Sequence, residues 1–211
     1  MTKQDKVIQE LIDKTLKELS QAEKPQSASR SWNSSQGYKF LIQWSNAVLL
    51  RILIRKLTDT LPKSEYRMKT QVDDAARSVV ANIEEGYKRA GTKEYIQFIS
   101  YSQGSLEEVK GDIERLMQDK FLASKPGSQL QNLGIDLKAW NDWCRNPLNS
   151  SKLLYFPIIS FKGNYRNLEE LKGKDLTYEI FIELINKTDW LLRKLVASLE
   201  MKIQKDKNKF L

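Results

Sequence analysis

The chain has 211 residues, of which 40% are hydrophobic and 29% charged, with a formal net charge of +8 at pH 7. This length suits one compact domain with appendages, and no apolar run is long enough to span a bilayer. The sequence has no histidine and one cysteine, Cys144. It therefore excludes histidine triads, histidine- or cysteine-cluster metal sites and intrachain disulfides. We expect no catalytic, metal or cofactor site, and, without signal-peptide features, a reducing cytoplasmic location.

The N-terminal segment predicts a detachable helical arm. Residues 3–20 carry apolar side chains at helical spacing, which is typical of a short amphipathic helix. The following residues, up to 37, are rich in Ser, Pro and Gln and predict a linker. This arm either packs on the rest of the chain or is reserved for a partner.

Residues 38–58 predict a helix that is apolar around most of its circumference. A helix of a monomeric bundle needs only one apolar stripe, so this one has apolar surface to spare. We expect the surplus to contact another subunit, through an oligomer interface formed by Leu49, Leu50, Leu53 and Ile54. The alternative is that terminal helices of the same chain cover it.

Two further helices predict a helical hairpin. One spans 66–86 and the next begins with Thr92 as its N-cap. Their apolar residues alternate in steps of four and three, which is the seam of a helical bundle. Small residues should let the two backbones approach closely: Ala75, Ala76, Gly104 and Ser105.

The C-terminal half predicts a shorter helix ending near 145, an excursion and a last long helix. Trp140 and Trp143 are expected to be core anchors, with base stacking as the alternative. Residues 146–175 combine Pro and Gly with an apolar, aromatic strip, which predicts ordered but irregular structure. The helix over 176–205 either completes or flanks the bundle and runs into a basic tail.

These elements predict an all-α fold, an up-and-down four-helix bundle with an N-terminal helical arm and a C-terminal extension. The expected organisation is an arm and linker (1–37), a bundle core (38–145), an irregular excursion (146–175) and a long C-terminal helix with its basic tail (176–211).

The positive charge is concentrated in residues 38–93, where 11 basic residues face 6 acidic ones. Clustered cations favour a polyanion, because they release counterions condensed on phosphates. The candidate nucleic-acid contacts are Arg51, Arg55, Lys56, Arg67, Lys69, Arg77, Lys88, Arg89 and Lys93. Alternatively the surface is merely solvated, and Arg51 and Arg55 pair with Asp73 or Asp74.

The stretch GYKRAGTK (86–93) superficially resembles a phosphate-binding loop. Its lysine and threonine are transposed, and it follows a helix instead of a strand, so we reject a nucleotide site. An exposed loop beside a helix N-terminus at Thr92 can contact a phosphate or simply be solvated.

Residues 70–109 resemble the signature hairpin of the bacterial four-helix bundle proteins. That family includes proteins encoded in intervening sequences of large-subunit rRNA genes and the accessory variability determinant of diversity-generating retroelements. The matching pieces are Gln71, Ala75-Ala76-Arg77, Asn82-Ile83-Glu84-Glu85-Gly86, Lys88-Arg89 and Gly104-Ser105-Leu106-Glu107-Glu108. The last helix also resembles a suffix helix found in a longer branch of the family.

The resemblance implies a bundle that often assembles as a homopentamer with a basic surface. In the retroelement branch it implies a reverse transcriptase and nucleic acid as partners. We therefore expect a non-enzymatic, oligomeric accessory protein that binds RNA or DNA, with no membrane partner. The alternative is a protein-interaction scaffold without a direct nucleic-acid role. An enzyme using Glu84, Glu85 and Glu108 is disfavoured, because no tuned acid–base pair is visible.

Overall fold

The computed structural model describes residues 36–159 and 165–208. The predicted arm helix over 3–20 lies outside these residues. The long helices are α3 (Ile42–Thr58), α4 (Tyr66–Lys88), α5 (Thr92–Gln118) and α7 (Tyr178–Asn208). A short helix, α6 (Leu137–Arg145), and a two-stranded antiparallel sheet, β1 (Pro157–Ile159) with β2 (Tyr165–Asn167), lie between α5 and α7.

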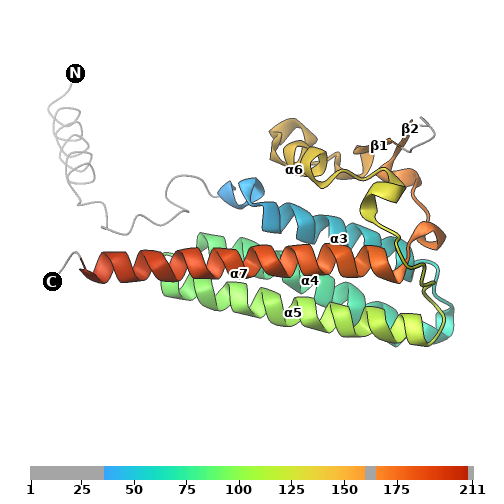
Figure 1. Cartoon of the computed structure of the whole chain (residues 1–211), viewed down its shortest axis with the longest axis horizontal. Helices are drawn as coiled ribbons and strands as arrows, with labels where there is room; N and C mark the ends of the chain where they lie inside the picture. Colours follow the sequence, from blue (N-terminus) through green and yellow to red (C-terminus); the bar gives the residue numbers. More distant parts are fainter. Residues whose placement is uncertain (1–35, 160–164, 209–211) are drawn as a thin grey trace, which may run out of the picture.

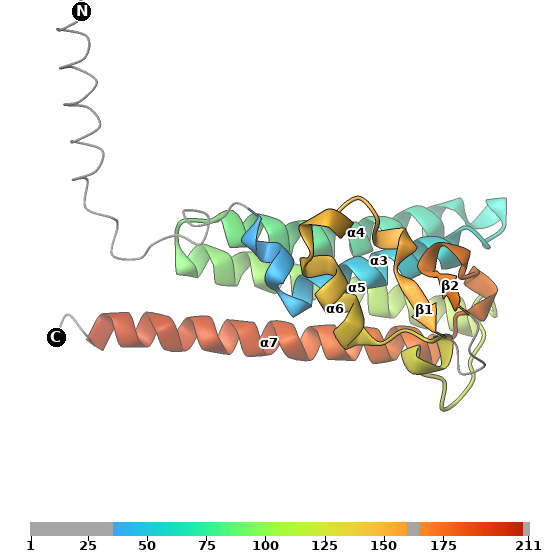
Figure 2. The ribbon, with the colours of Figure 1, turned by 90° about the horizontal axis from the view of Figure 1, so that it is seen from above.

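The four long helices form an up-and-down bundle (Figure 1). α4 packs against α3 and α5, and α7 packs against α5 and α3, so the four enclose a common core. The predicted all-α bundle is confirmed. α6 and the small sheet lie over α3, outside the four-helix arrangement (Figures 1 and 2).

The hairpin of α4 and α5 is joined by both apolar and polar contacts. The α4 seam residues Val72, Val79 and Ile83 have no exposed surface. Within the α5 seam, the Ser102 hydroxyl donates to the carbonyl oxygen of Val79 at 2.9 Å. A Cβ on Gly86 would lie 2.7 Å from the Cβ of Phe98, so glycine allows the helices to meet there.

One predicted contribution to this close approach is wrong. A Cβ on Gly104 would meet nothing within 4 Å, so this glycine faces open space. Ala75 and Ala76 are buried, in keeping with a role at the helix contact. Sequence spacing placed Gly104 near the seam, but the buried seam residues there are Ser102 and Leu106, two positions to either side.

The predicted oligomer interface on α3 is also wrong for this structure. Leu49, Leu50, Leu53 and Ile54 are all completely buried within the single chain. α4 and α7 cover α3 from the bundle side, and α6 with the 3-10 helices Gly37–Phe40 and Gly173–Asp175 covers it from outside. The apolar circumference of α3 is thus closed by its own chain, because the segments between α5 and α7 fold back over it.

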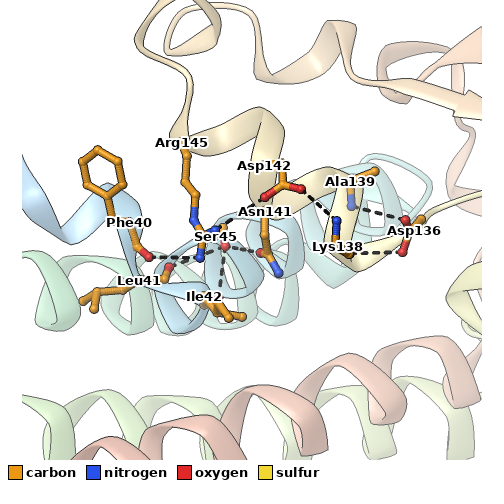
Figure 3. A network of polar contacts seen from close by, with 10 residues as sticks. All are labelled: Phe40, Leu41, Ile42, Ser45, Asp136, Lys138, Ala139, Asn141, Asp142 and Arg145. Atoms are coloured by element: carbon orange, nitrogen blue, oxygen red, sulfur yellow. Dashed lines mark hydrogen bonds and ion pairs between the residues drawn. The ribbon is translucent and has the colours of Figure 1, made fainter.

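α6 is anchored on α3 by polar contacts as well as by packing. The Asp136 carboxylate caps α6 by accepting from the backbone N–H of Lys138 and of Ala139 (Figure 3). The Trp140 indole nitrogen donates to the carbonyl oxygen of Ser45 at 2.7 Å. Because Trp140 has no exposed surface, the prediction that it is a core anchor is confirmed.

Candidate nucleic-acid interface

The nine predicted cations do not share one face. Lys88, Arg89 and Lys93 surround the connection between α4 and α5 and are called the loop cluster here. The α3 cluster is Arg51, Arg55 and Lys56. Arg67, Lys69 and Arg77 lie on α4. Lys69 and Lys88 are 19 residues apart on one helix, a separation of about 28 Å.

The α3 cluster is largely used to hold the fold together. It lines a hollow of about 420 Å³ with Leu153 and Leu154. The Lys56 ammonium donates to the carbonyl oxygen of Glu169 at 2.8 Å, and burial lowers its pKa, opposed by Glu169 and Asp59. These contacts tie the excursion to α3, so Lys56 has a structural task.

Arg55 pairs with Asp73, which is one of the two partners that the sequence suggested for it. The Arg55 Nε lies 4.0 Å from the Asp73 Oδ2, and the Thr58 hydroxyl donates to Asp73 at 3.3 Å. Burial raises the pKa of Asp73 above its ordinary value, while Arg55 opposes that change. In the described part of the chain Arg51 has no ion pair, so it is the freest cation of this cluster.

On α4 two of the three cations are paired at the surface. Lys69 lies 2.8 Å from Asp59, and Arg77 lies 3.3 Å from Asp74. Exposed pairs of this kind contribute only about 0–1 kcal/mol, so a phosphate can compete for such cations. Arg67 is exposed and makes no ion pair with any described residue.

The loop cluster is held in place by aromatic rings. The Lys88 ammonium lies 5.6 Å from the ring centroid of Tyr38, and the Arg89 guanidinium lies 4.4 Å from that of Phe98. Such cation–π contacts fix a cation without neutralising it. Arg89 also pairs with Glu85 at 3.7 Å, whereas Lys93 is exposed without an ion pair to the described residues.

Tyr38 itself is firmly placed. Its ring meets the ring of Trp44 edge-on at 5.4 Å, and the Trp44 indole donates to the Glu84 carboxylate at 2.8 Å. Burial, and then the charge of Glu84, raise the pKa of Tyr38 above 10. Tyr38 therefore stays neutral at pH 7 and presents a rigid ring to Lys88.

The helix terminus at this loop differs from the prediction. The N-cap of α5 is Gly91, and Thr92 is the first helical residue. The Glu94 carboxylate accepts from the Gly91 N–H at 3.3 Å, so an internal carboxylate already occupies part of the anion-binding position. Side chains, more than the helix terminus, are available to a phosphate here.

The basic end of α7 completes this region, and the sequence alone did not place it there. α7 extends past the other helices at the end of the bundle that carries the α4–α5 connection (Figures 1 and 2). A groove of about 740 Å³ separates it from α5, with Ile96 on one side and Met201 and Lys205 on the other. The basic tail was visible in the sequence, but its position depends on the path of α7.

A comparison with family models finds a match to the helical hairpin and its flanking segments. Residues 39–139 match the family described as 23S rRNA-intervening sequence protein. Over these residues, which make up just under half of the chain, the sequence is similar to that family. The comparisons with curated proteins and with solved structures find no match.

The intervening-sequence protein match covers α3, α4, α5 and the first residues of α6, so the loop cluster and the α3 cluster lie within it. Two residues of the hairpin pattern described in the sequence analysis have clear structural tasks. Gln71 Nε2 donates across the hairpin to the Asp112 carboxylate at 3.0 Å, and Gly86 permits the close helix contact described above. α7 lies outside the matched range.

Groups that could support catalysis are engaged in structure. Glu84 accepts from Trp44, and Glu85 pairs with Arg89. Burial raises the pKa of the Cys144 thiol to about 12, so the thiolate is not formed near neutral pH. Among the described residues no group of three or more metal-ligating side chains gathers, and no described helix has the length and apolarity needed to cross a membrane.

Proposed function

We propose that the chain is a non-enzymatic RNA-binding protein whose loop cluster contacts RNA phosphates. The observation that carries the proposal is the position of Lys88 and Arg89, each held over an aromatic ring at an exposed end of the bundle. The similarity of residues 39–139 to a family named after 23S rRNA supports RNA as the nucleic acid.

The physical basis is phosphate neutralisation. Lys88, Arg89 and Lys93 lie in or directly beside the short α4–α5 connection, and the basic end of α7 extends from the same end of the bundle. Each phosphate contact releases condensed counterions, which favours binding at low salt. The aromatic supports reduce the side-chain entropy lost on binding, because the cations are already ordered.

A comparison of two triple variants tests this assignment. The first is Lys88→Gln, Arg89→Gln and Lys93→Gln, and its matched control is Arg67→Gln, Lys69→Gln and Arg77→Gln. Both remove three positive charges. We expect the loop-cluster variant to lower the affinity for RNA about tenfold or more and the control to lower it by much less. Fluorescence anisotropy with a labelled RNA measures both, and equal losses would assign binding to net charge alone.

A second candidate function is docking of a protein partner on the excursion. Leu148, Tyr155 and Ile159 are each more than half exposed there, which is unusual for large apolar side chains close together in sequence. The reverse transcriptase implied by the resemblance is one such partner. Co-purification of a defined protein that survives ribonuclease treatment, and is lost in Leu148→Ser with Tyr155→Ser, would favour this function.

The homopentamer implied by the resemblance is likewise a proposal, separate from the fold of the single chain. Leu49, Leu50, Leu53 and Ile54 are unavailable to another subunit, so a homo-oligomer must use other surfaces. Light scattering of the full chain distinguishes a particle of 24.6 kDa from a fivefold larger one.

A further inference from the structure

A pocket of about 380 Å³ lies between α3, α6 and α7, and it contains none of the nine predicted cations. This volume is within the range of small-ligand sites. Its walls combine three apolar side chains with three amides, one lysine and one indole: Ile42, Leu137, Leu191, Asn46, Asn141, Asn186, Lys187 and Trp190.

Asn46 supplies a polar group that the fold leaves unused. Its side chain is only 2% exposed, and its Oδ1 has no hydrogen-bond partner among the described residues. A buried amide oxygen without a donor is costly, and native proteins rarely retain one without a reason. The fold therefore leaves one amide of α3 unsatisfied at the wall of the pocket.

Asn141 presents a second amide in a fixed orientation. Its Oδ1 accepts from the Ser45 hydroxyl, and its amide nitrogen points away from Ser45 (Figure 3). The adjacent Trp140 is bonded to the same Ser45 through its backbone carbonyl, which locks α6 on α3. Asn46 of α3 and Asn141 of α6 thus place two amides at the wall of the pocket, on two helices that are joined by hydrogen bonds.

Trp190 supplies a flat apolar surface at the mouth of the pocket. Its side chain is 58% exposed on α7, although large aromatics are usually buried. The Lys194 ammonium lies 5.4 Å from its ring centroid. An exposed indole beside a cation is the arrangement on which a nucleobase stacks while its phosphate finds a positive charge.

We propose that this pocket binds one unpaired nucleobase, stacked on Trp190 and packed against the apolar walls, with the Asn46 and Asn141 amides at its inner edge. The base edge carries donors and acceptors side by side, and asparagine amides pair with such edges, adenine in particular. Leu137 and Leu191 match the apolar faces of the ring. The inference rests on the proposed RNA-binding function and names the part of the RNA that is recognised.

The test uses the full chain with two labelled RNAs, a fully paired duplex and a hairpin of equal length with an adenosine loop. Trp190→Ala should lower the affinity for the looped RNA about tenfold and leave the affinity for the duplex unchanged. Tyr66→Ala, which removes another exposed aromatic on α4, is the matched control and should bind both RNAs as the unmodified chain does.

Asn46→Leu separates recognition from stability. Removing the unpaired amide should raise the melting temperature, whereas a structural role would lower it, and the affinity for the looped RNA should fall about fivefold. Adenosine monophosphate alone provides a further probe. It should quench the tryptophan fluorescence that Trp190 contributes, which is missing in the Trp190→Ala variant. Quenching by the free nucleotide would assign the same nucleobase chemistry to a small molecule.

The outcomes distinguish the pocket from the loop cluster. The pocket proposal is overturned if Trp190→Ala and Asn46→Leu bind the looped RNA as tightly as the unmodified chain and the nucleotide causes no quenching. That result would leave the proposed phosphate binding intact. If neither RNA binds but adenosine monophosphate quenches Trp190, the pocket stands and the proposed RNA-binding function fails.

Discussion

Asp112 is a carboxylate without exposed surface between α4 and α5. One oxygen accepts from Gln71 at 3.0 Å and from Arg115 at 2.6 Å, and the other has no partner among the described residues. Burial raises the pKa of Asp112 above its ordinary 3.8, and the Arg115 contact only partly opposes this. The ionised form is therefore disfavoured in the folded protein, and Asp112 lowers stability at neutral pH.

Asp112→Asn should stabilise the protein at pH 7, because it removes the buried charge and keeps an oxygen for Gln71 and Arg115. We expect about 1 kcal/mol, or about 2–4 °C in melting temperature. The advantage should shrink as the pH falls through the raised pKa toward 3.8, since Asp112 then becomes protonated. Thermal melts at pH 7 and pH 4 measure both, and a lower melting temperature of the variant at pH 7 would contradict this account.

Residue types indicated the cations of the site, but not their contacts. Lys56 and Lys88 look equivalent in sequence, yet one donates to a backbone carbonyl and the other lies over an aromatic ring. Those differences come from segments more than 30 residues away along the chain. The pocket was missed for a similar reason, although Asn186 and Trp190, one helical turn apart, were a visible signal.

At the scale of elements, the two glycines of the hairpin provide a matched comparison. A Cβ at position 104 of α5 would meet nothing within 4 Å, whereas one at Gly86 would lie 2.7 Å from Phe98 and 2.9 Å from Tyr95. Gly104→Ala should therefore stabilise the chain by about 1 kcal/mol through helix propensity alone. Gly86→Ala should cost about 1–3 kcal/mol, because the helices must separate.

Chemical denaturation of the two glycine variants checks this prediction. Equal effects on the free energy of unfolding would mean that α4 and α5 do not meet as closely at Gly86 as the structure shows.

The positions of the helices along the chain were largely predictable from the sequence, but the segments that pack against each helix were not. The alternating steps of four and three on α4 and α5 describe a seam whichever helix covers it. For α3, an apolar circumference is compatible with a second subunit or with covering segments of the same chain. The return of α6 and the excursion over α3 decides between them, and no local pattern in residues 38–58 contains that information.

For the whole molecule, this closure predicts that Leu53 acts in a core. Leu53→Ala should lower the free energy of unfolding by about 2–5 kcal/mol. Any dependence of the midpoint of unfolding on protein concentration should be the same for Leu53→Ala and the unmodified chain, because loss of core packing, unlike loss of an interface, does not change mass action. Urea titrations at two concentrations tenfold apart test this. If the midpoint rises with protein concentration for the unmodified chain but not for Leu53→Ala, Leu53 lies in an interface between subunits.

The net charge of +8 acts on the molecule as a whole, whereas the proposed phosphate contacts lie at one end of it. The aromatic supports of the loop cluster and the projecting end of α7 distinguish that end of the molecule from the other predicted cations. General attraction to a polyanion would instead depend on total charge and be indifferent to which cations are removed.

The salt dependence of RNA affinity tests this claim most directly. For a single-stranded RNA, the logarithm of the binding constant should fall linearly with the logarithm of salt concentration, with a slope near −0.7 for each phosphate contact. Removing Lys88, Arg89 and Lys93 as glutamines should reduce the magnitude of that slope by about 2, whereas removing Arg67, Lys69 and Arg77 should leave it nearly unchanged. An affinity indifferent to salt, or a slope that the loop-cluster variant leaves intact, would contradict the assignment.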